Sequence, residues 1–266
     1  MKRVFITGAS SGIGAALARC YAEQGAVLGL VARRESRLRE LAAGLPHAER
    51  HRIYALDVTD HAALAAAAQD FIDALGGIDE VIANAGISHG TVTEHAEDLA
   101  IFERIVATNL TATAATFAPF IAAMKAQAQS GNRAGRLVGI ASVAGIRGLP
   151  GAEAYSASKA AVISYCESLR IELAQSGIKV VTIAPGYIDT PMIRGNPYPM
   201  PFLMPADRFA VRAVTRIAAG SSYSVIPWQM GVIAKLMRLL PNRIYDAVFS
   251  RVRRKKRAST GAPEQI

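Results

Sequence analysis

The chain opens with the stretch RVFITGASSGIG, residues 3–14, and this stretch sets the architecture expected for the whole sequence. A short apolar run over residues 3–7 is followed by a glycine-rich turn and then by a segment of helical periodicity. Glycines at positions 8, 12 and 14 allow a tight turn and the close approach of a pyrophosphate, and free N–H groups at the helix start face that anion. The spacing is GxxxGxG rather than the commoner GxGxxG. The order of strand, turn and helix predicts a nucleotide-binding turn, and the alternative is a plain strand–helix connection.

The same alternation of short and long segments continues along the chain. Nearly continuous apolar runs are typical of strands buried on both faces of a parallel sheet. Longer helical patterns between them imply right-handed crossovers and one α/β domain over residues 1–227. The predicted strands are Arg3–Thr7, Val27–Ala32, Arg52–Leu56, Glu80–Asn84, Arg136–Ala141, Lys179–Ala184 and Tyr223–Pro227. The predicted helices are Gly12–Gln24, Glu35–Leu45, His61–Leu75, Asp98–Gln129, Ala152–Gln175 and Pro205–Ala219.

Composition narrows the class of protein. The chain has 266 residues, of which 51% are hydrophobic and 19% are charged, so it can bury a sizeable core and is neither disordered nor collagenous. Two cysteines, Cys20 and Cys166, cannot form a disulfide framework, which favours a reducing compartment. No run reaches the ~18–20 apolar residues of a spanning helix. The first apolar run is too short for a secretory signal, so we expect the protein on the cytoplasmic side.

The net charge of +9 is unevenly distributed. Residues 1–234 hold 21 Lys and Arg against 19 Asp and Glu, whereas residues 235–266 hold 9 against 2. The basic character therefore belongs mainly to the C-terminal tail. It gives little support to nucleic-acid binding by the main body, and the tail lacks interleaved aromatic residues or a nucleic-acid-reading motif.

The end of the second predicted strand bears on cofactor choice. An NAD site places a carboxylate here for the ribose 2′-hydroxyl, but the sequence reads Ala32-Arg33-Arg34. A guanidinium can pair with a 2′-phosphate through two hydrogen bonds. NADP(H) is therefore preferred over NAD(H). Glu35 lies close by, and the alternative is that Arg33 and Arg34 form a solvated helix entrance.

A tyrosine and a lysine stand four residues apart, at Tyr155 and Lys159. In a helix they share one face. A phenol has an ordinary pKa of ~10, and a nearby cation favours the phenolate. Such a tyrosine can give a proton to a carbonyl oxygen or take it back. The alternative is an ordinary surface pair.

Ser142 stands where the predicted strand Arg136–Ala141 ends. The carboxyl ends of parallel strands line the ligand crevice. A hydroxyl there can hydrogen-bond a substrate carbonyl and stabilise a developing oxyanion. The alternative is a turn or helix-start serine.

Further short motifs accompany these residues in a fixed order between residue 2 and about residue 227. The set comprises Gly8, Ser10, Ser11, Gly12, Ile13 and Gly14 in the first turn, Asp57-Val58, Asn84-Ala85-Gly86, Asn109, Ser142, Tyr155 with Lys159, and Pro185-Gly186 with Thr190. Each motif is weak alone, but the ordered set is specific. In these residues the chain resembles the short-chain dehydrogenase/reductase family.

The resemblance implies a role for each matching residue. Ser142 would orient a substrate carbonyl, Tyr155 would be the acid/base, and Lys159 would lower the pKa of Tyr155 and hold the nicotinamide ribose. Asn109 would keep a water between Lys159 and solvent. The implied cofactor contacts are the first turn, Asp57 and Val58 beside the adenine, Asn84, Ala85 and Gly86 at the central strand and ribose, and Pro185, Gly186 and Ile188–Thr190 over the carboxamide.

The resemblance also implies a doubly wound, Rossmann-like sheet of seven parallel strands. It implies a homodimer or homotetramer formed through Asp98–Gln129 and Ala152–Gln175. Two carried-over roles have alternatives from physics alone. A mid-helix Asn109 is often a local kink or a satisfied polar group, and Asp57 could cap the helix that starts near Asp60.

Residues 187–205 are the predicted substrate lid. Prolines at 191, 197, 199, 201 and 205 exclude a regular helix or central strand over residues 190–205. The candidate substrate contacts are mostly apolar, namely Ile146, Leu149, Tyr187, Ile193 and Met204. Arg147 and Arg194 are the cations that could face a substrate anion. The pattern favours an apolar or lipid-like carbonyl or alcohol, and the alternative is that these residues pack the lid.

Residues 228–257 form a predicted C-terminal helical extension. Apolar positions recur at helical spacing and are followed by a basic run over residues 251–257. An amphipathic helix flanked by cations can lie on an anionic membrane surface. The alternatives are a helix pair that closes the substrate cleft and a dimer contact with a solvated basic end. Residues 258–266 are predicted to be disordered.

The sequence thus predicts an NADP(H)-dependent oxidoreductase, without a metal, that transfers a hydride between nicotinamide and a carbonyl or alcohol carbon. Its location would be cytoplasmic, with peripheral contact to the inner face of a membrane. A catalytically quiet NADP(H)-binding scaffold or sensor is the alternative, against which the intact Ser142, Tyr155 and Lys159 argue.

Overall fold

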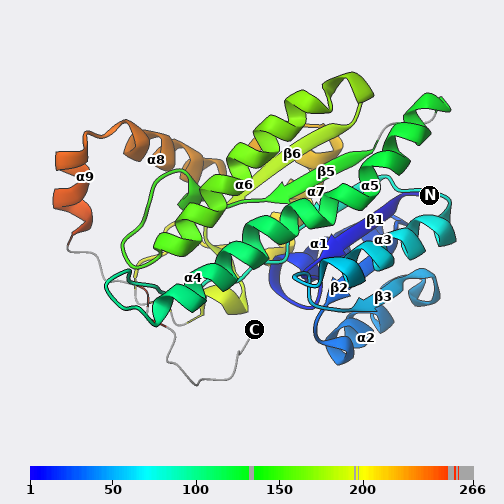
Figure 1. The fold of residues 1–266 in the computed structure, drawn as a ribbon, viewed down its shortest axis with the longest axis horizontal. Coiled ribbons are helices and arrows are strands. Elements are labelled where there is room, and N and C mark those ends of the chain that lie inside the picture. Colours follow the sequence, from blue (N-terminus) through cyan, green and yellow to red (C-terminus); the bar gives the residue numbers. More distant parts are fainter. Residues whose placement is uncertain (132–134, 195, 197, 251–254, 256, 258–266) are drawn as a thin grey trace.

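A seven-stranded parallel sheet forms the centre of the molecule (Figure 1). The computed structural model describes residues 1–131, 135–194, 196, 198–250, 255 and 257. The strand order is β3-β2-β1-β4-β5-β6-β9, with every neighbouring pair parallel. The strands are β1 (Arg3–Thr7), β2 (Val27–Ala32), β3 (Arg52–Ala55), β4 (Glu80–Ala83), β5 (Arg136–Ile140), β6 (Lys179–Pro185) and β9 (Tyr223–Ile226). The predicted doubly wound sheet of seven parallel strands is confirmed.

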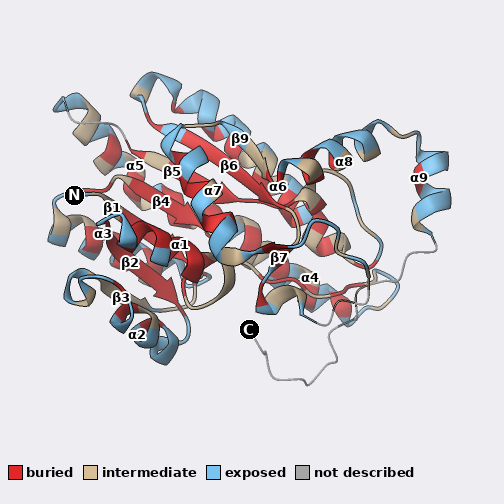
Figure 2. Ribbon diagram, turned by 180° about the vertical axis from the view of Figure 1, so that it is seen from behind, coloured by how far each residue is buried: buried red, intermediate tan, exposed pale blue. Residues whose placement is uncertain are grey.

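Helices cover both faces of this sheet. They are α1 (Gly12–Glu23), α2 (Glu35–Ala43), α3 (His61–Leu75), α4 (Asp98–Val106), α5 (Ala112–Gln129), α6 (Glu153–Glu172), α7 (Ala206–Ala218), α8 (Trp228–Leu239) and α9 (Asn242–Phe249). One core packs α1, α2 and α7 against one face, and the other packs α3, α5 and α6 against the opposite face. Figure 2 shows the inner strands buried on both sides.

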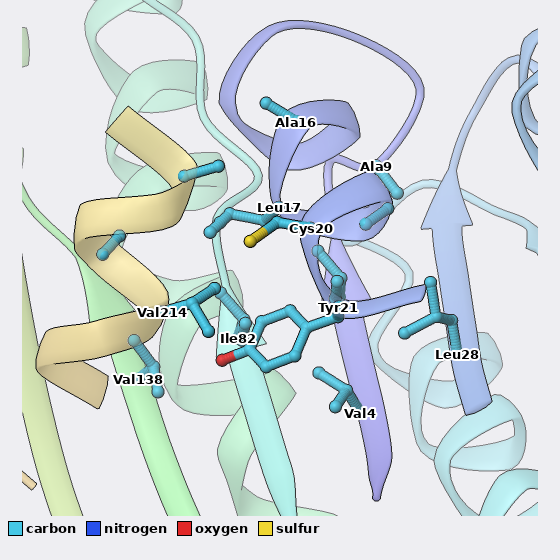
Figure 3. Packing of buried hydrophobic residues seen from close by; sticks show 14 of the residues in the cluster. Val4, Ala9, Ala16, Leu17, Cys20, Tyr21, Leu28, Ile82, Val138 and Val214 are labelled. Atoms are coloured by element: carbon cyan, nitrogen blue, oxygen red, sulfur yellow. The ribbon is translucent and has the colours of Figure 1, made fainter. Parts of the chain in front are cut away.

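Alternation along each strand assigns side chains to the two cores. Val4 and Ile6 of β1 belong to the core under α1 and α7, whereas Phe5 belongs to the other one. In Figure 3, Tyr21 of α1 lies against the sheet beside Val4. Its hydroxyl donates a 2.5 Å hydrogen bond to the fully buried carboxylate of Glu80. Neighbouring side chains of one strand thus stabilise opposite layers.

The predicted helix Asp98–Gln129 differs from the structure in one respect. A single π-helical turn, Ala107–Thr111, separates α4 from α5. Each π turn inserts an extra residue into the helix and is frequent at functional sites. The prediction of one continuous α-helix is therefore wrong at these residues, which include Asn109.

The predicted lid contains a small ladder of its own. Strands β7 (Ile188–Asp189) and β8 (Met204–Pro205) pair in parallel outside the main sheet. A 3₁₀ turn, Pro191–Ile193, follows β7. The proline-rich segment contains no longer element among its described residues, as its composition predicts.

Helices α8 and α9 follow the last strand and lie at one end of the molecule (Figure 1). The inner side of α8 buries Met230 and Ala234, and Gly231 packs against Val225 of β9. Among the described residues, one helical stretch, Asp98–Gln129, has the length and mean hydropathy (1.4) of a spanning segment. That stretch includes the π turn and contributes Phe117 and Phe120 to the core.

Candidate active site

The first turn forms a tight cradle at the end of β1. Gly8 and Gly12 adopt positive φ angles of 67° and 55°, which side-chain-bearing residues rarely adopt. A Cβ at Gly14 would lie 2.2 Å from the carbonyl oxygen of Gly8. The start of α1 therefore packs directly on the turn, and its N–H groups are available to an anion.

One pocket lies at the carboxyl ends of the central strands, beside this cradle. Most of the predicted site residues line it, namely Gly8, Ser10, Ser11, Gly12, Ile13, Arg33, Arg34, Asp57, Val58, Asn84, Ala85, Gly86, Ser142, Tyr155, Lys159, Pro185, Gly186, Ile188 and Thr190. Gly14 and Asn109 lie behind the lining, where they pack the residues that form it. The structure thus brings together residues from eight separate stretches of sequence.

Two arginines stand at the end of the pocket reached from β2. Arg34 donates hydrogen bonds of 3.1 and 3.3 Å to the hydroxyls of Ser10 and Ser11 in the first turn. The guanidinium of Arg33 lies 3.8 Å from a carboxylate oxygen of Asp57. Both side chains are exposed and line the pocket. The structure therefore places two cations beside the glycine-rich turn.

Asp57 has a role other than helix capping. Its Oδ1 accepts hydrogen bonds from the backbone N–H and the hydroxyl of Thr59, at 2.9 and 2.8 Å. Asp60 caps α3 instead, because its Oδ1 accepts from the N–H of Ala63 at 3.0 Å. Val58, next to Asp57, is buried at the pocket wall.

Ser142, Tyr155 and Lys159 meet at the other end of the pocket. Ser142 lies two residues after the end of β5, and the helical spacing of Tyr155 and Lys159 on α6 places the Lys159 amine 5.9 Å from the Tyr155 ring centroid. Lys159 is 5% exposed, and its amine donates a 2.8 Å hydrogen bond to the carbonyl of Ile140. The end of β5 thus holds both Ser142 and the lysine amine.

Burial governs the titration of this group of residues. Burial raises the pKa of Tyr155, and a hydrogen bond with Ser142 lowers it. Burial also lowers the pKa of Lys159 to about 8. Lys159 is not among the groups that shift the pKa of Tyr155 in this arrangement. Burial is the larger of the two effects, so the pKa of Tyr155 is raised above its ordinary value, and the lowering that the resemblance assigns to Lys159 is not present.

Asn109 connects the pocket to α6 from behind. Its side chain is fully buried and makes three hydrogen bonds. Its Nδ2 donates to the carbonyl of Ile87 and to the hydroxyl of Ser158, both at 3.0 Å, and its Oδ1 accepts from the N–H of Ile87 at 2.8 Å. Asn109 is thus a satisfied polar group on a local helix distortion, as the physical alternative predicted, and it also fixes the segment after Gly86.

Sequence reasoning assigned no individual role to three further residues that lie at the pocket or behind it. Thr7 accepts hydrogen bonds from the N–H groups of Asn84 and Ala85, both at 3.1 Å, and so joins two of the predicted motifs. Arg104 and Thr108 also line the pocket. Thr108 could have been noticed because it adjoins the candidate residue Asn109, whereas no motif in the sequence points to Arg104.

The basic tail departs from the prediction. Arg257 donates hydrogen bonds to Asp98, at 2.9 and 3.0 Å, and to Glu97, at 2.8 Å. Lys255 donates to the carbonyl and hydroxyl of Ser88, at 2.8 and 2.7 Å. These two cations are paired with the body of the protein and do not belong to a solvated basic end. The other cations of the predicted run, Arg251, Arg253, Arg254 and Lys256, and the predicted disordered segment 258–266 lie outside the described residues.

Arg147 is also used differently from the prediction. Its guanidinium donates to the carbonyl of Leu240 at 2.8 Å and to that of Met237. It therefore faces the C-terminal end of α8 rather than a substrate anion. Among the described residues no group of three or more His, Cys, Asp or Glu is arranged to hold a metal ion.

The sequence relatives are oxidoreductases. The family model described as short chain dehydrogenase matches residues 2–197. An uncharacterized oxidoreductase of Myxococcus xanthus is 35% identical over 257 residues, which is 95% of this chain and 98% of that protein. The cis-4-hydroxycyclohexanecarboxylate dehydrogenase of Sinomonas cyclohexanicum is 35% identical over 195 residues, or 72% of this chain and 75% of that enzyme.

Solved structures show the same architecture. A short-chain dehydrogenase from Streptomyces avermitilis superimposes with a TM-score of 0.76 at 21% identity, covering 94% of this chain and 98% of that one. A 3-ketoacyl-(acyl-carrier-protein) reductase from Brucella melitensis, complexed with NADH, superimposes with a TM-score of 0.75 at 28% identity, covering 84% and 94%. With the family model covering most of the chain, the resemblance is confirmed: this protein belongs to the short-chain dehydrogenase family of oxidoreductases.

Proposed function

We propose that the protein is an NADP(H)-dependent oxidoreductase that interconverts an apolar carbonyl compound and its alcohol, with Tyr155 as acid/base. The observation that carries this proposal is the meeting of Ser142, Tyr155 and Lys159 in the pocket that also contains the glycine-rich turn. A dinucleotide fits this pocket because the turn presents free N–H groups beside two arginines. The absence of a side chain at Gly12 also keeps the pocket open towards Thr190, since a Cβ there would lie 3.2 Å from the Thr190 side chain.

The chain's own residues supply the proton chemistry. When bound, the nicotinamide supplies or accepts the hydride. The Ser142 hydroxyl donates a hydrogen bond to the substrate carbonyl, which stabilises negative charge on its oxygen. The Tyr155 hydroxyl gives that oxygen its proton and takes it back in the reverse direction. The Lys159 amine lies close to the Tyr155 ring and would hold the nicotinamide ribose. Asn109 would hold a water between Lys159 and solvent.

The preference for NADP(H) is supported by charge. Arg33 and Arg34 lie beside the turn, and Arg34 already hydrogen-bonds the hydroxyls of Ser10 and Ser11. The 2′-phosphate of NADP(H) adds negative charge that a guanidinium can pair with. Asp57, the nearest carboxylate of the pocket to Arg33, is itself paired with that arginine, which reduces its repulsion of a phosphate.

The apolar substrate is supported by the lid side of the pocket. Pro191, Met192 and Ile193 line it beyond Thr190. The rings of Tyr187 and Tyr198 lie 6.3 Å apart in the same segment. Apolar walls with few polar groups suit a ketone or alcohol whose carbonyl is its main polar feature.

Peripheral contact with an anionic membrane is supported by the outer face of α8 and α9. Its large apolar side chains are solvent-exposed, namely Trp228, Val232, Leu236, Leu239, Ile244 and Val248, a set called here the outer apolar stripe. Lys235, Arg238 and Arg243 are exposed on the same helices. An amphipathic helix with flanking cations binds anionic lipid surfaces. The cytoplasmic side remains the proposed location, in keeping with the free thiols of Cys20 and Cys166.

Self-association through α4, α5 and α6 remains part of the proposal. Leu99 on α4 and Ile171 on α6 are 61% and 65% exposed, as apolar residues of an interface between subunits would be in one isolated chain. A homodimer or homotetramer would cover them.

The proposed function is tested with Tyr155→Phe. We expect the purified variant to reduce an accepted ketone with NADPH about 10²- to 10⁴-fold more slowly than the parent protein, since the general acid is lost. Binding of NADPH, followed by its fluorescence, should remain. Equal ketone-reduction rates for variant and parent would refute the mechanism. Tight NADPH binding without turnover of any carbonyl compound by the parent would favour the quiet scaffold.

A further inference from the structure

The loop that follows Ser142 is held by the C-terminal extension. Arg147, in this loop, donates hydrogen bonds to the carbonyl oxygens of Met237 and Leu240, the latter at 2.8 Å, and to Asn242 Oδ1 at 3.1 Å. These acceptors lie where α8 ends and α9 begins. The last carbonyls of a helix lack partners within it and carry partial negative charge. The Arg147 guanidinium therefore caps the C-terminal end of α8 by donating hydrogen bonds to carbonyls there.

Tyr245 of α9 completes the attachment. The Arg147 guanidinium carbon lies 3.8 Å from the centroid of its ring, a cation–π contact, and its hydroxyl donates a 2.6 Å hydrogen bond to the carbonyl of Gly148. Tyr245 is 7% exposed although most of α9 is exposed, and Phe249 stacks on its other side at 4.3 Å. Arg147 and Tyr245 are called here the loop clamp.

The clamped loop is also in direct contact with the catalytic group. The Ser142 hydroxyl accepts a 3.1 Å hydrogen bond from the N–H of Ala144, two residues along the loop. Gly145 packs so closely on α6 that a Cβ there would lie 2.6 Å from the carbonyl carbon of Lys159. A shift of the loop would therefore move Ser142 relative to Tyr155, because Tyr155 belongs to α6, which is packed against the sheet through Val162 and Cys166.

The extension reaches the pocket from a second side as well. Met230 of α8 packs on Gly186, and a Cβ at Gly186 would lie 2.8 Å from Met230 Cγ. Gly186 lines the pocket next to Pro185. Helix α8 is thus fixed against the sheet end and can serve as a rigid support for the loop at 143–148.

We propose that Arg147 and Tyr245 are positioning residues of the active site: by clamping the loop after Ser142 to α8 and α9, they fix the hydroxyl of Ser142 against that of Tyr155. This inference rests on the proposed function. The inner side of the C-terminal extension is then part of the catalytic machinery, whatever its outer side contacts. A displacement on the order of 1 Å at such a site costs up to about 10²-fold in rate.

The test compares Arg147→Met, Tyr245→Leu and Tyr245→Phe with Arg216→Met, a control on α7 whose exposed side chain makes no described contact with the loop. In the first two variants we expect kcat to fall about tenfold or more, with the Kd for NADPH, measured by fluorescence, unchanged. Tyr245→Phe keeps the ring under Arg147 and should recover most of the lost rate. Arg216→Met should match the parent.

The pH profile separates positioning from mere structural support. Because the hydrogen bond with Ser142 lowers the pKa of Tyr155, its loss raises that pKa, so the kcat of alcohol oxidation in Arg147→Met should reach its plateau at higher pH than in the parent. A reduced melting temperature with an unchanged kcat and pH profile would overturn the proposal. Failure of the proposed function would give a different result, because Tyr155→Phe would then reduce the ketone as fast as the parent.

Discussion

The amine of Lys159 donates its 2.8 Å hydrogen bond to the carbonyl of Ile140, the last residue of β5. The bond joins α6 to the sheet at the point where the chain turns towards Ser142. It also keeps the amine almost fully buried, at 5% exposure, in a position where its protonated form is poorly solvated.

This burial predicts a pH-dependent stability of the ligand-free protein. The pKa of Lys159 is lowered from 10.5 to about 8, so between these values the unfolded chain binds more protons than the folded one. Stability attributable to this group therefore rises with pH from about 8 to 10.5. The free energy of unfolding of the parent, measured by urea unfolding relative to that of Lys159→Met, should rise by up to about 3 kcal/mol between pH 7 and pH 10.5. A difference between the two proteins that is constant with pH would contradict this prediction.

The arginines beside the glycine-rich turn predict a selective loss of NADPH affinity. Arg34→Ala and Arg33→Ala each remove a cation from the place where the 2′-phosphate would bind, so NADPH should bind about 10- to 100-fold more weakly. NADH affinity should change little. Titration of NADPH and NADH fluorescence measures both constants. Arg37→Ala is the control, because Arg37 pairs with Glu40 on the surface of α2. Equal losses for NADPH and NADH would show that the arginines do not distinguish the cofactors.

The close contact within the turn predicts that Gly14→Ala is severely destabilising. The new Cβ would lie 2.2 Å from the Gly8 carbonyl oxygen and 2.7 Å from the side chain of Asn84. Backbone atoms must move, and we expect a loss of roughly 3 kcal/mol or more in the free energy of unfolding together with the loss of NADPH binding. Gly44→Ala, at the end of α2, has its nearest contact at 3.6 Å and should be nearly neutral. Urea unfolding of both variants decides the matter, and similar stabilities would refute the prediction.

The outer apolar stripe predicts a membrane-binding phenotype that point variants can isolate. Truncation after Pro227 would also remove buried Met230 and Tyr245, so Leu236→Gln combined with Leu239→Gln is the sharper change. These two side chains are 59% and 80% exposed, and their replacement should leave folding intact. Sedimentation with phosphatidylserine-containing vesicles should fall at least about tenfold, since burial of each leucine contributes ~1.5–3 kcal/mol.

Val211→Gln is the matched control for that experiment, since Val211 is 58% exposed on α7, away from the stripe. Binding of the parent should weaken as salt is added, because the flanking cations contribute through screened attraction. A parent protein that does not sediment with these vesicles would exclude a membrane as the partner. Loss of dimer formation in the double variant would instead identify the stripe as a contact between subunits.

The fold was predictable because its signals are local. All seven predicted strands are present, and β1 and β2 have the predicted bounds, since continuous apolar runs must be buried on both faces. The ends of α6 lie one to three residues inside the predicted ones, because Ala152 is a non-helical cap residue and the chain after Leu173 passes into a 3₁₀ helix, Ala174–Ser176. The π turn at Asn109 carries no comparable local signal. It is stabilised by contacts with Ile87 and Ser158, which come from other parts of the chain.

The candidate site was predictable where motifs define it and not where tertiary contacts do. Most of the predicted residues lie together in one pocket, because the carboxyl ends of parallel strands meet at one edge of a sheet. The partners of Arg147 and Arg257 could not be found in this way. Tyr245 and Asp98 lie far from them in sequence, and no periodicity connects residues that meet only after folding.

The extra residue of the π turn has a consequence for the two helices that it joins. A helix rotates by about 100° per residue, so the turn sets the angular offset between the side chains of α4 and those of α5. Deletion of one residue within Ala107–Thr111 would restore an unbroken α-helical ladder and would turn one of the two segments by that angle. Either Phe117 and Phe120 would leave the sheet, or Ile101 and Ile105 would leave their own small core. The π turn therefore sets the rotation between α4 and α5, so that α5 can bury its apolar side against the sheet while α4 buries its own against the small core.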